Sequence, residues 1–455
     1  MATTLAHAHP AGSLNERAAR HLWMHFTKLE ADVPILVRGD GCYVWDDAGK
    51  RYLDGLAALF CVNAGHGRAE IADAGAEQGR RLAFYQAWGY AHPPAIELAE
   101  RVAALAPGDL NRVFFTSGGS EAVDSALKLA RNFYRLRGEG SRTKIIARET
   151  AYHGTSMGAL TATGITALRA QFEPLVPGGR HAPNTNAYRA PADRDPLWAA
   201  EAIEETILFE GPETVAAVIL EPLQNAGGCF APPEGYWQRV REICDRHGVL
   251  LIADEVICSW GRLGHWFGIE RYGTVPDMIT TAKGLTSAYA PMGALIVSDR
   301  IAAPFIESDQ MFAHGFTFGA HPVAAAVALA NLDVMQREDL CGRVREHEPA
   351  FRAMLESLRD LPIVGDVRGA GYFWALELVR DQDRAERFPK EQIDHLLRGV
   401  VGPEMRRRGL LARADDRGDP VVQLCPPLIA GPPQFDEIEA VLRQVLKVAW
   451  EAMRG

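Results

Sequence analysis

Continuous apolar runs separated by helical segments dominate the middle of the chain. The runs are residues 144–147, 215–220, 249–253 and 294–297. A strand that is buried on both faces has no alternation of apolar and polar residues, so such runs are typical of a parallel sheet covered by helices on both sides. The pattern therefore predicts an α/β fold.

The two ends of the chain follow other patterns. A polar arm and a helix over 15–26 precede three short strands at 35–38, 42–45 and 51–53, with glycine turns between them. After about residue 321 we expect a long alanine-rich helix over 323–336, a strand within 371–378 and an amphipathic helix over 436–453. We expect three units: residues 1–67, an arm and meander that pack with the small domain; 68–325, the large domain; and 326–455, a small α+β domain.

Composition narrows the function classes. The 455 residues are 47% hydrophobic and 23% charged, and the net charge of −10 is spread along the chain. No basic patch is available for nucleic acid or an anionic membrane. The seven cysteines are scattered, no metal-binding spacing is evident, and we find neither an apolar leader nor a run long enough to span a bilayer. We expect a cytoplasmic protein without a metal.

Lys283 is the first candidate for chemistry. It is one of only seven lysines and lies among small and apolar residues, directly after the predicted strand 276–280 and without a neighbouring acid. A desolvated lysine loses its proton more easily and can then attack a carbonyl carbon. A surface lysine on a polar turn remains the alternative at this point.

Two further predicted strands are followed by groups that could bind one ligand together with Lys283. Gly118, Gly119 and Ser120 form a glycine turn at a helix start, where free backbone amides can bind phosphate. Asp254 follows the strand 250–253, and ligands of open α/β sheets bind at the carboxyl ends of strands. A phosphate site, a carboxylate and a lysine match the three ends of pyridoxal 5′-phosphate (PLP). The alternative to a PLP site is that Asp254 has a structural role and that Lys283 is unrelated to it.

An ordered set of segments along nearly the whole chain resembles the class III aminotransferases, PLP enzymes of fold type I. The segments are Leu53-Asp54-Gly55, Ser120-Glu121-Ala122-Val123-Asp124, Tyr152-His153-Gly154, Glu221-Pro222-Leu223-Gln224, Ala253-Asp254-Glu255-Val256, Ala282-Lys283-Gly284 and His314-Gly315-Phe316-Thr317-Phe318. The resemblance implies a large domain with a mainly parallel seven-stranded sheet between helices, and a smaller α+β domain. It also implies a homodimer with both active sites at the subunit interface; the sequence leaves open whether two dimers pair into a tetramer.

The resemblance also implies roles for single residues. Lys283 would bind the aldehyde of PLP, and Asp254 would pair with its ring nitrogen. The remaining cofactor contacts would be Gly119 and Ser120 at the phosphate, Tyr152 and Val256 beside the ring, Glu221, and Thr317 at the phosphate of the neighbouring subunit's cofactor.

Departures from the family pattern favour the branch that acts on amines. Ile257 and Ala226 stand where ornithine and 4-aminobutyrate enzymes usually carry glutamine and glutamate, and residues 53–68 resemble enzymes that use pyruvate. We therefore expect transfer of an amino group from a primary amine or omega-amino acid to a keto acid, with pyruvate as the expected acceptor, by a ping-pong mechanism. A 2-oxoglutarate-dependent diamine or omega-amino acid transaminase and an inactive scaffold are the alternatives.

An aromatic pocket can bind an uncharged amine. A cation in the same pocket can bind the carboxylate of the keto acid. We expect the pocket to be formed by Phe26, Phe60, Trp88, Tyr152 and Trp260. Arg413 best matches the arginine that binds carboxylates in related enzymes, and Arg417 is its rival. The physiological amine and the enantiomer preference stay open.

Overall fold

A seven-stranded sheet forms the centre of the computed structural model, which describes residues 12–28, 33–191 and 193–454. In sheet order the strands are β4 (Leu110–Thr116), β10 (Gly293–Ser298), β9 (Met278–Thr281), β8 (Leu250–Asp254), β7 (Val215–Leu220), β5 (Lys144–Arg148) and β6 (Gly179–Ala182). Only β10 runs antiparallel to its neighbours, and every other pair in this sheet is parallel. The prediction of a mainly parallel α/β sheet is confirmed.

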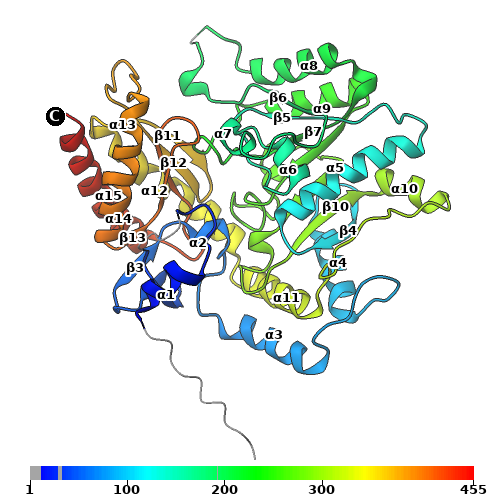
Figure 1. Ribbon diagram of the computed structural model, residues 1–455, viewed down its shortest axis with the longest axis horizontal. Helices are drawn as coiled ribbons and strands as arrows, with labels where there is room; N and C mark the ends of the chain where they lie inside the picture. The colour runs from blue at the N-terminus through cyan, green and yellow to red at the C-terminus, as the bar shows by residue number, and fades with distance from the viewer. Residues whose placement is uncertain (1–11, 29–32, 192, 455) are drawn as a thin grey trace, which may run out of the picture.

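Helices cover both faces of this sheet (Figure 1). In β7, Ala217 and Ile219 join one apolar core, whereas Val218 and Leu220 join the other. The first core includes α5 (Gly119–Leu136) and α6 (Met157–Ala162). The second includes α4 (Pro93–Leu105), α8 (Trp198–Glu210), α9 (Tyr236–His247) and α11 (Pro322–Arg337). Burial on both faces explains why the strand sequences are continuously apolar.

The N-terminal meander joins a strand from the C-terminal part of the chain. Strands β1 (Leu36–Asp40), β2 (Tyr43–Asp46) and β3 (Arg51–Asp54) are antiparallel, and β13 (Leu410–Leu411) adds to β3 in parallel. A third sheet has the order β11 (Val364–Ala370), β12 (Phe373–Leu378), β15 (Val421–Leu424) and β14 (Arg413–Asp415). The C-terminal elements gather on one side of the molecule, beside the seven-stranded sheet (Figure 1).

The remaining α-helices are mostly short connections around these sheets. They are α1 (Leu14–His21), α2 (Ala57–Phe60), α3 (Ala69–Arg81), α7 (Thr166–Arg169), α10 (Asp299–Glu307), α12 (Leu340–Ser357), α13 (Lys390–Asp394), α14 (Gly402–Arg407) and α15 (Pro432–Met453). None of the helices in the described ranges is long and apolar enough to cross a membrane.

The first helix is shorter than the predicted 15–26. It ends at His21 and buries none of its residues, and the following Leu22, Trp23 and Phe26 are exposed. Most helical stability in proteins comes from packing an apolar face against the core. Because this helix lacks such packing, little stabilises further turns beyond His21. Most of the predicted polar arm lies outside the described residues.

Candidate active site

Three strands of the central sheet carry the candidate residues at their carboxyl ends. Asp254 is the last residue of β8 and pairs in register with Thr280 of β9. Lys283 is separated from β9 by one residue, Ala282, and begins a short 3₁₀ turn. Gly119 and Ser120 begin α5, which is separated from the end of β4 by two residues. Because β4, β8 and β9 point the same way, these groups share one edge of the sheet.

Asp254 is held by several hydrogen bonds. Its side chain is 3% exposed, and Oδ2 lies 2.6 Å from Nδ1 of His153. Oδ1 accepts bonds of 3.2 Å from the Thr280 hydroxyl and from the Val256 amide. Nε2 of His153 is buried without a hydrogen-bond partner in the described chain. Sequence reasoning assigned no role to His153, although it directly follows Tyr152 in a quoted motif.

Lys283 presents its amine without a competing partner. Its side chain makes no hydrogen bond or ion pair with the described residues, and Nζ lies 5.8 Å from the centre of the Phe60 ring. Both Lys283 and Phe60 have positive φ angles, +42° and +63°, which are uncommon outside glycine. Such conformations cost energy and concentrate at functional sites. The arrangement leaves a nitrogen available for covalent chemistry.

The glycine turn provides backbone amides at a helix N-terminus. The first helical hydrogen bond of α5 runs from the Ala122 amide to the Gly118 carbonyl, so the amides of Gly119 and Ser120 lie before the helical ladder. No side chain caps this helix. A Cβ at position 119 would lie 2.9 Å from Cγ1 of Val256, which explains the glycine. This end of α5 can bind a phosphate.

Tyr152 and Glu221 lie beside Asp254. The Tyr152 amide is 3.5 Å from Oε1 of Glu221, and Glu221 is buried. Burial raises the pKa of the Tyr152 hydroxyl, although the nearby charges of Arg417 and Arg413 oppose this. Burial also raises the pKa of Glu221. Both side chains therefore favour their neutral forms more than they would in water.

The two candidate arginines share one acid. Arg417 donates from Nε and from Nη2 to the buried carboxylate of Asp415, each at 2.8 Å. Arg413 lies 3.9 Å from the same group and makes no side-chain hydrogen bond within the described chain. Its guanidinium is 5.8 Å from the Phe60 ring centre, whereas that of Arg417 is 5.8 Å from the Tyr152 ring centre. Burial, followed by the charge of Arg417, lowers the pKa of Arg413 to about 10.

The other predicted pocket residues differ in their exposure. Phe26 and Trp88 are 75% and 60% exposed, and Thr317 is also exposed. No ring contact or hydrogen bond in the described ranges joins these three to Lys283 or Asp254. Trp260 is completely buried, and its indole donates a 2.7 Å hydrogen bond to Thr281. That placement favours a packing role for Trp260 over contact with a substrate.

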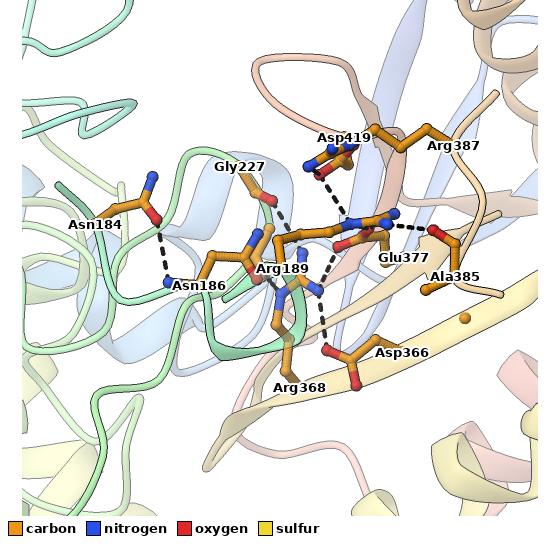
Figure 2. A network of polar contacts seen from close by, with 12 residues as sticks. Asn184, Asn186, Arg189, Gly227, Asp366, Arg368, Glu377, Ala385, Arg387 and Asp419 are labelled. Carbon is orange, nitrogen blue, oxygen red and sulfur yellow. Dashed lines mark hydrogen bonds and ion pairs between the residues drawn. The ribbon is translucent and has the colours of Figure 1, made fainter. Parts of the chain in front are cut away.

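A buried charge network supports the hairpin that carries the arginines (Figure 2). Glu377 of β12 has a fully buried side chain and pairs with Arg189 and, at 2.6 Å, with Arg368. Arg368 also donates to the carbonyls of Gly228 and Gly227. The network reaches the β14–β15 connection because Asp419 pairs with Arg189 at 3.3 Å and with Arg387 at 2.5 Å.

Glu377→Gln should destabilise the protein by about 3 kcal/mol, because two mostly buried arginines, 12% and 11% exposed, would lose their shared counter-charge. The midpoint of urea unfolding measures this effect. Glu386→Gln is the matched control, since Glu386 forms an exposed pair with Arg380 and should cost less than about 1 kcal/mol. Equal shifts in the two variants would contradict the assigned role of the network.

The residues present fit PLP. Its phosphate matches the free amides of Gly119 and Ser120, its ring nitrogen matches the buried carboxylate of Asp254, and its aldehyde matches the unpaired amine of Lys283. The unpartnered Nε2 of His153 lies in the same buried cluster. Among the described residues, no group of three or more histidine, cysteine, aspartate or glutamate side chains could hold a metal ion.

Two relatives of the chain bear the names of aminotransferases. A probable aminotransferase of Mycobacterium tuberculosis is 56% identical over 96% of this chain and 95% of its own length. The putrescine–pyruvate aminotransferase of Pseudomonas aeruginosa is 40% identical over 95% of this chain and 91% of its own.

A solved (S)-enantioselective omega-transaminase from Thermomicrobium roseum superposes with a TM-score of 0.92 at 41% identity, over 96% of this chain and 98% of that one. Such neighbours place the fold in PLP fold type I. Residues 28–446 match the family described as aminotransferase class-III. The chain therefore belongs to the class-III aminotransferases and is a transaminase.

Proposed function

We propose that the protein transfers an amino group from a primary amine or omega-amino acid to pyruvate, with PLP as cofactor and by a ping-pong mechanism. The observation that carries the proposal is the placement of Lys283, Asp254 and the Gly119–Ser120 turn on one edge of the sheet. These three groups match the three functional ends of one cofactor. The class-III family is PLP-dependent, which supports the same cofactor.

Each residue then has a defined task. Bound PLP withdraws electrons from the substrate carbon that carries the amine. Lys283 would hold the cofactor through its amine, and the same amine would move a proton at the substrate carbon, first as general base and then as acid. Asp254 would stabilise a proton on the ring nitrogen of the bound cofactor, and the contact with His153 holds the Asp254 carboxylate in place.

The acceptor's carboxylate binds at Arg413 in this proposal. Arg417 is already bound through two hydrogen bonds by Asp415, whereas the guanidinium of Arg413 has no side-chain hydrogen bond within the described ranges. Arg413 and Lys283 both lie 5.8 Å from the centre of the Phe60 ring, on which the substrate would rest. An arginine fork binds a carboxylate in a fixed orientation.

We also propose a homodimer that works in the cytoplasm. Exposed aromatic side chains such as Phe84, Tyr85, Trp88 and Phe318 suit burial against a second copy, which would bring Thr317 towards the neighbouring cofactor. The seven cysteines are all free, as is usual in a reducing compartment. Sedimentation of the purified chain tests the dimer, and a monomer would count against it.

A comparison of acceptors tests the proposed reaction. With one amine donor in excess, pyruvate should support turnover with a higher kcat/KM than 2-oxoglutarate. The name of the Pseudomonas aeruginosa relative, which specifies putrescine and pyruvate, supports this choice. A donor panel of putrescine, β-alanine, taurine and 1-phenylethylamine then defines the amine. Preference for 2-oxoglutarate would favour the diamine or omega-amino acid alternative.

A further inference from the structure

Asp415 sets the charge of the proposed acceptor site. Two guanidinium groups, Arg413 and Arg417, lie 3.9 Å and 2.8 Å from the buried carboxylate of Asp415 in the β14–β15 hairpin, whereas the charge of the adjacent Asp416 is balanced by its pair with Arg398. This cluster therefore carries one net positive charge. Burial raises the pKa of Asp415, but the charge and hydrogen bonds of Arg417, together with the charge of Arg413, outweigh burial and leave the pKa below its usual value. Asp415 is therefore ionised at neutral pH.

One net positive charge suits an acceptor with one carboxylate. A monocarboxylic keto acid bound at Arg413 neutralises the cluster, whereas a dicarboxylic keto acid brings a second negative charge. The guanidinium that could receive that second charge is Arg417, and Asp415 already occupies it with two hydrogen bonds of 2.8 Å. The Asp415 carboxylate therefore takes the place of a substrate's second carboxylate and repels it.

Asp415 cannot easily move aside to admit the second carboxylate. Its backbone pairs with Val421 in the β14–β15 ladder, and its side chain is 4% exposed. Beyond Arg417, the hairpin connection is fixed by Asp419, which pairs with Arg387 and Arg189 of the buried network (Figure 2). The acid is thus held beside the arginines by both its main chain and its neighbours.

We propose that Asp415 is a specificity-determining residue that excludes dicarboxylic keto acids by occupying Arg417. The inference rests on the proposed function, since it requires acceptor binding at Arg413. Removal of the charge without a change of shape should free Arg417 and admit a second carboxylate. Asp415→Gln would overfill the space, so Asp415→Asn is the informative variant.

The test compares kcat/KM for pyruvate and for 2-oxoglutarate in wild type and D415N, with the same amine donor. The ratio of the two values should shift towards 2-oxoglutarate by about 10-fold to 100-fold in D415N. Because both acceptors are measured on one preparation, a reduced fraction of folded enzyme does not affect the ratio. Asp415→Ser is a second neutral variant that must give the same shift.

Asp416→Asn is the matched control. Asp416 adjoins Asp415, but it pairs with Arg398 at 2.9 Å and is 34% exposed, so its removal should leave the ratio within about twofold. An unchanged ratio in both D415N and D415S, with wild type preferring pyruvate, would overturn this inference alone. A wild type that uses neither acceptor, or that prefers 2-oxoglutarate, would overturn the proposed function itself.

Discussion

Lys283→Ala should reduce turnover by about a thousandfold or more, because it removes both the covalent anchor of the cofactor and the group that moves the proton. No other described lysine can replace it, since Lys283 is the only one placed directly after β9, at the edge that holds Asp254. Initial rates of keto acid consumption with an amine donor measure the loss.

A control separates this loss from general damage. Lys447→Ala removes an exposed lysine from α15 and should leave the rate unchanged. Borohydride reduction of the wild-type holoenzyme should attach the cofactor to the peptide that contains Lys283, and mass spectrometry of the digest locates it. A K283A enzyme with full turnover, or a label on another peptide, would refute the assignment.

Asp254→Asn should lower kcat by about 100-fold to 1,000-fold. The amide can still accept hydrogen bonds from Val256 and Thr280, but it cannot supply the negative charge that keeps the ring nitrogen protonated. The substitution therefore isolates the charge from the shape of the side chain. Single-turnover rates with a saturating amine donor measure the chemical step directly.

Thr280→Val provides a graded comparison. It removes a single 3.2 Å hydrogen bond to Asp254 but leaves the carboxylate, so we expect a cost of roughly 1 kcal/mol, which is about fivefold in rate. If T280V lost as much activity as D254N, the packing of β8 against β9 would explain the effect better than the charge.

The sequence predicted best where one physical cause dominates. The strands at 215–220 and 250–253 were recognisable because both of their faces are buried. Asp254 and Lys283 could be placed at one edge because each lies at the carboxyl end of its strand. The carboxyl ends of parallel strands lie at the same edge of a sheet. Such placements need only local sequence and the direction of the strands.

Other features depend on contacts that local sequence does not encode. The apolar run of β10 is compatible with either direction, so its antiparallel course became clear only from the pairing. The bond between His153 and Asp254 joins residues that are 101 positions apart. An aromatic residue such as Trp260 can face a pocket or a core, and its complete burial and its hydrogen bond to Thr281 could not be read from its position in the sequence.

The parallel pairing of β3 with β13 constrains how the protein is made. Leu53 pairs with Leu410, and the Lys50 ammonium donates to the carbonyl of Arg407, which lies 357 positions later. Because the ribosome delivers the chain from its N-terminus, one edge of the meander stays unpaired until nearly all of the chain has emerged. Unpaired strand edges recruit other strands. Chains released before residue 410 should therefore aggregate through this meander, even if their central sheet has already formed.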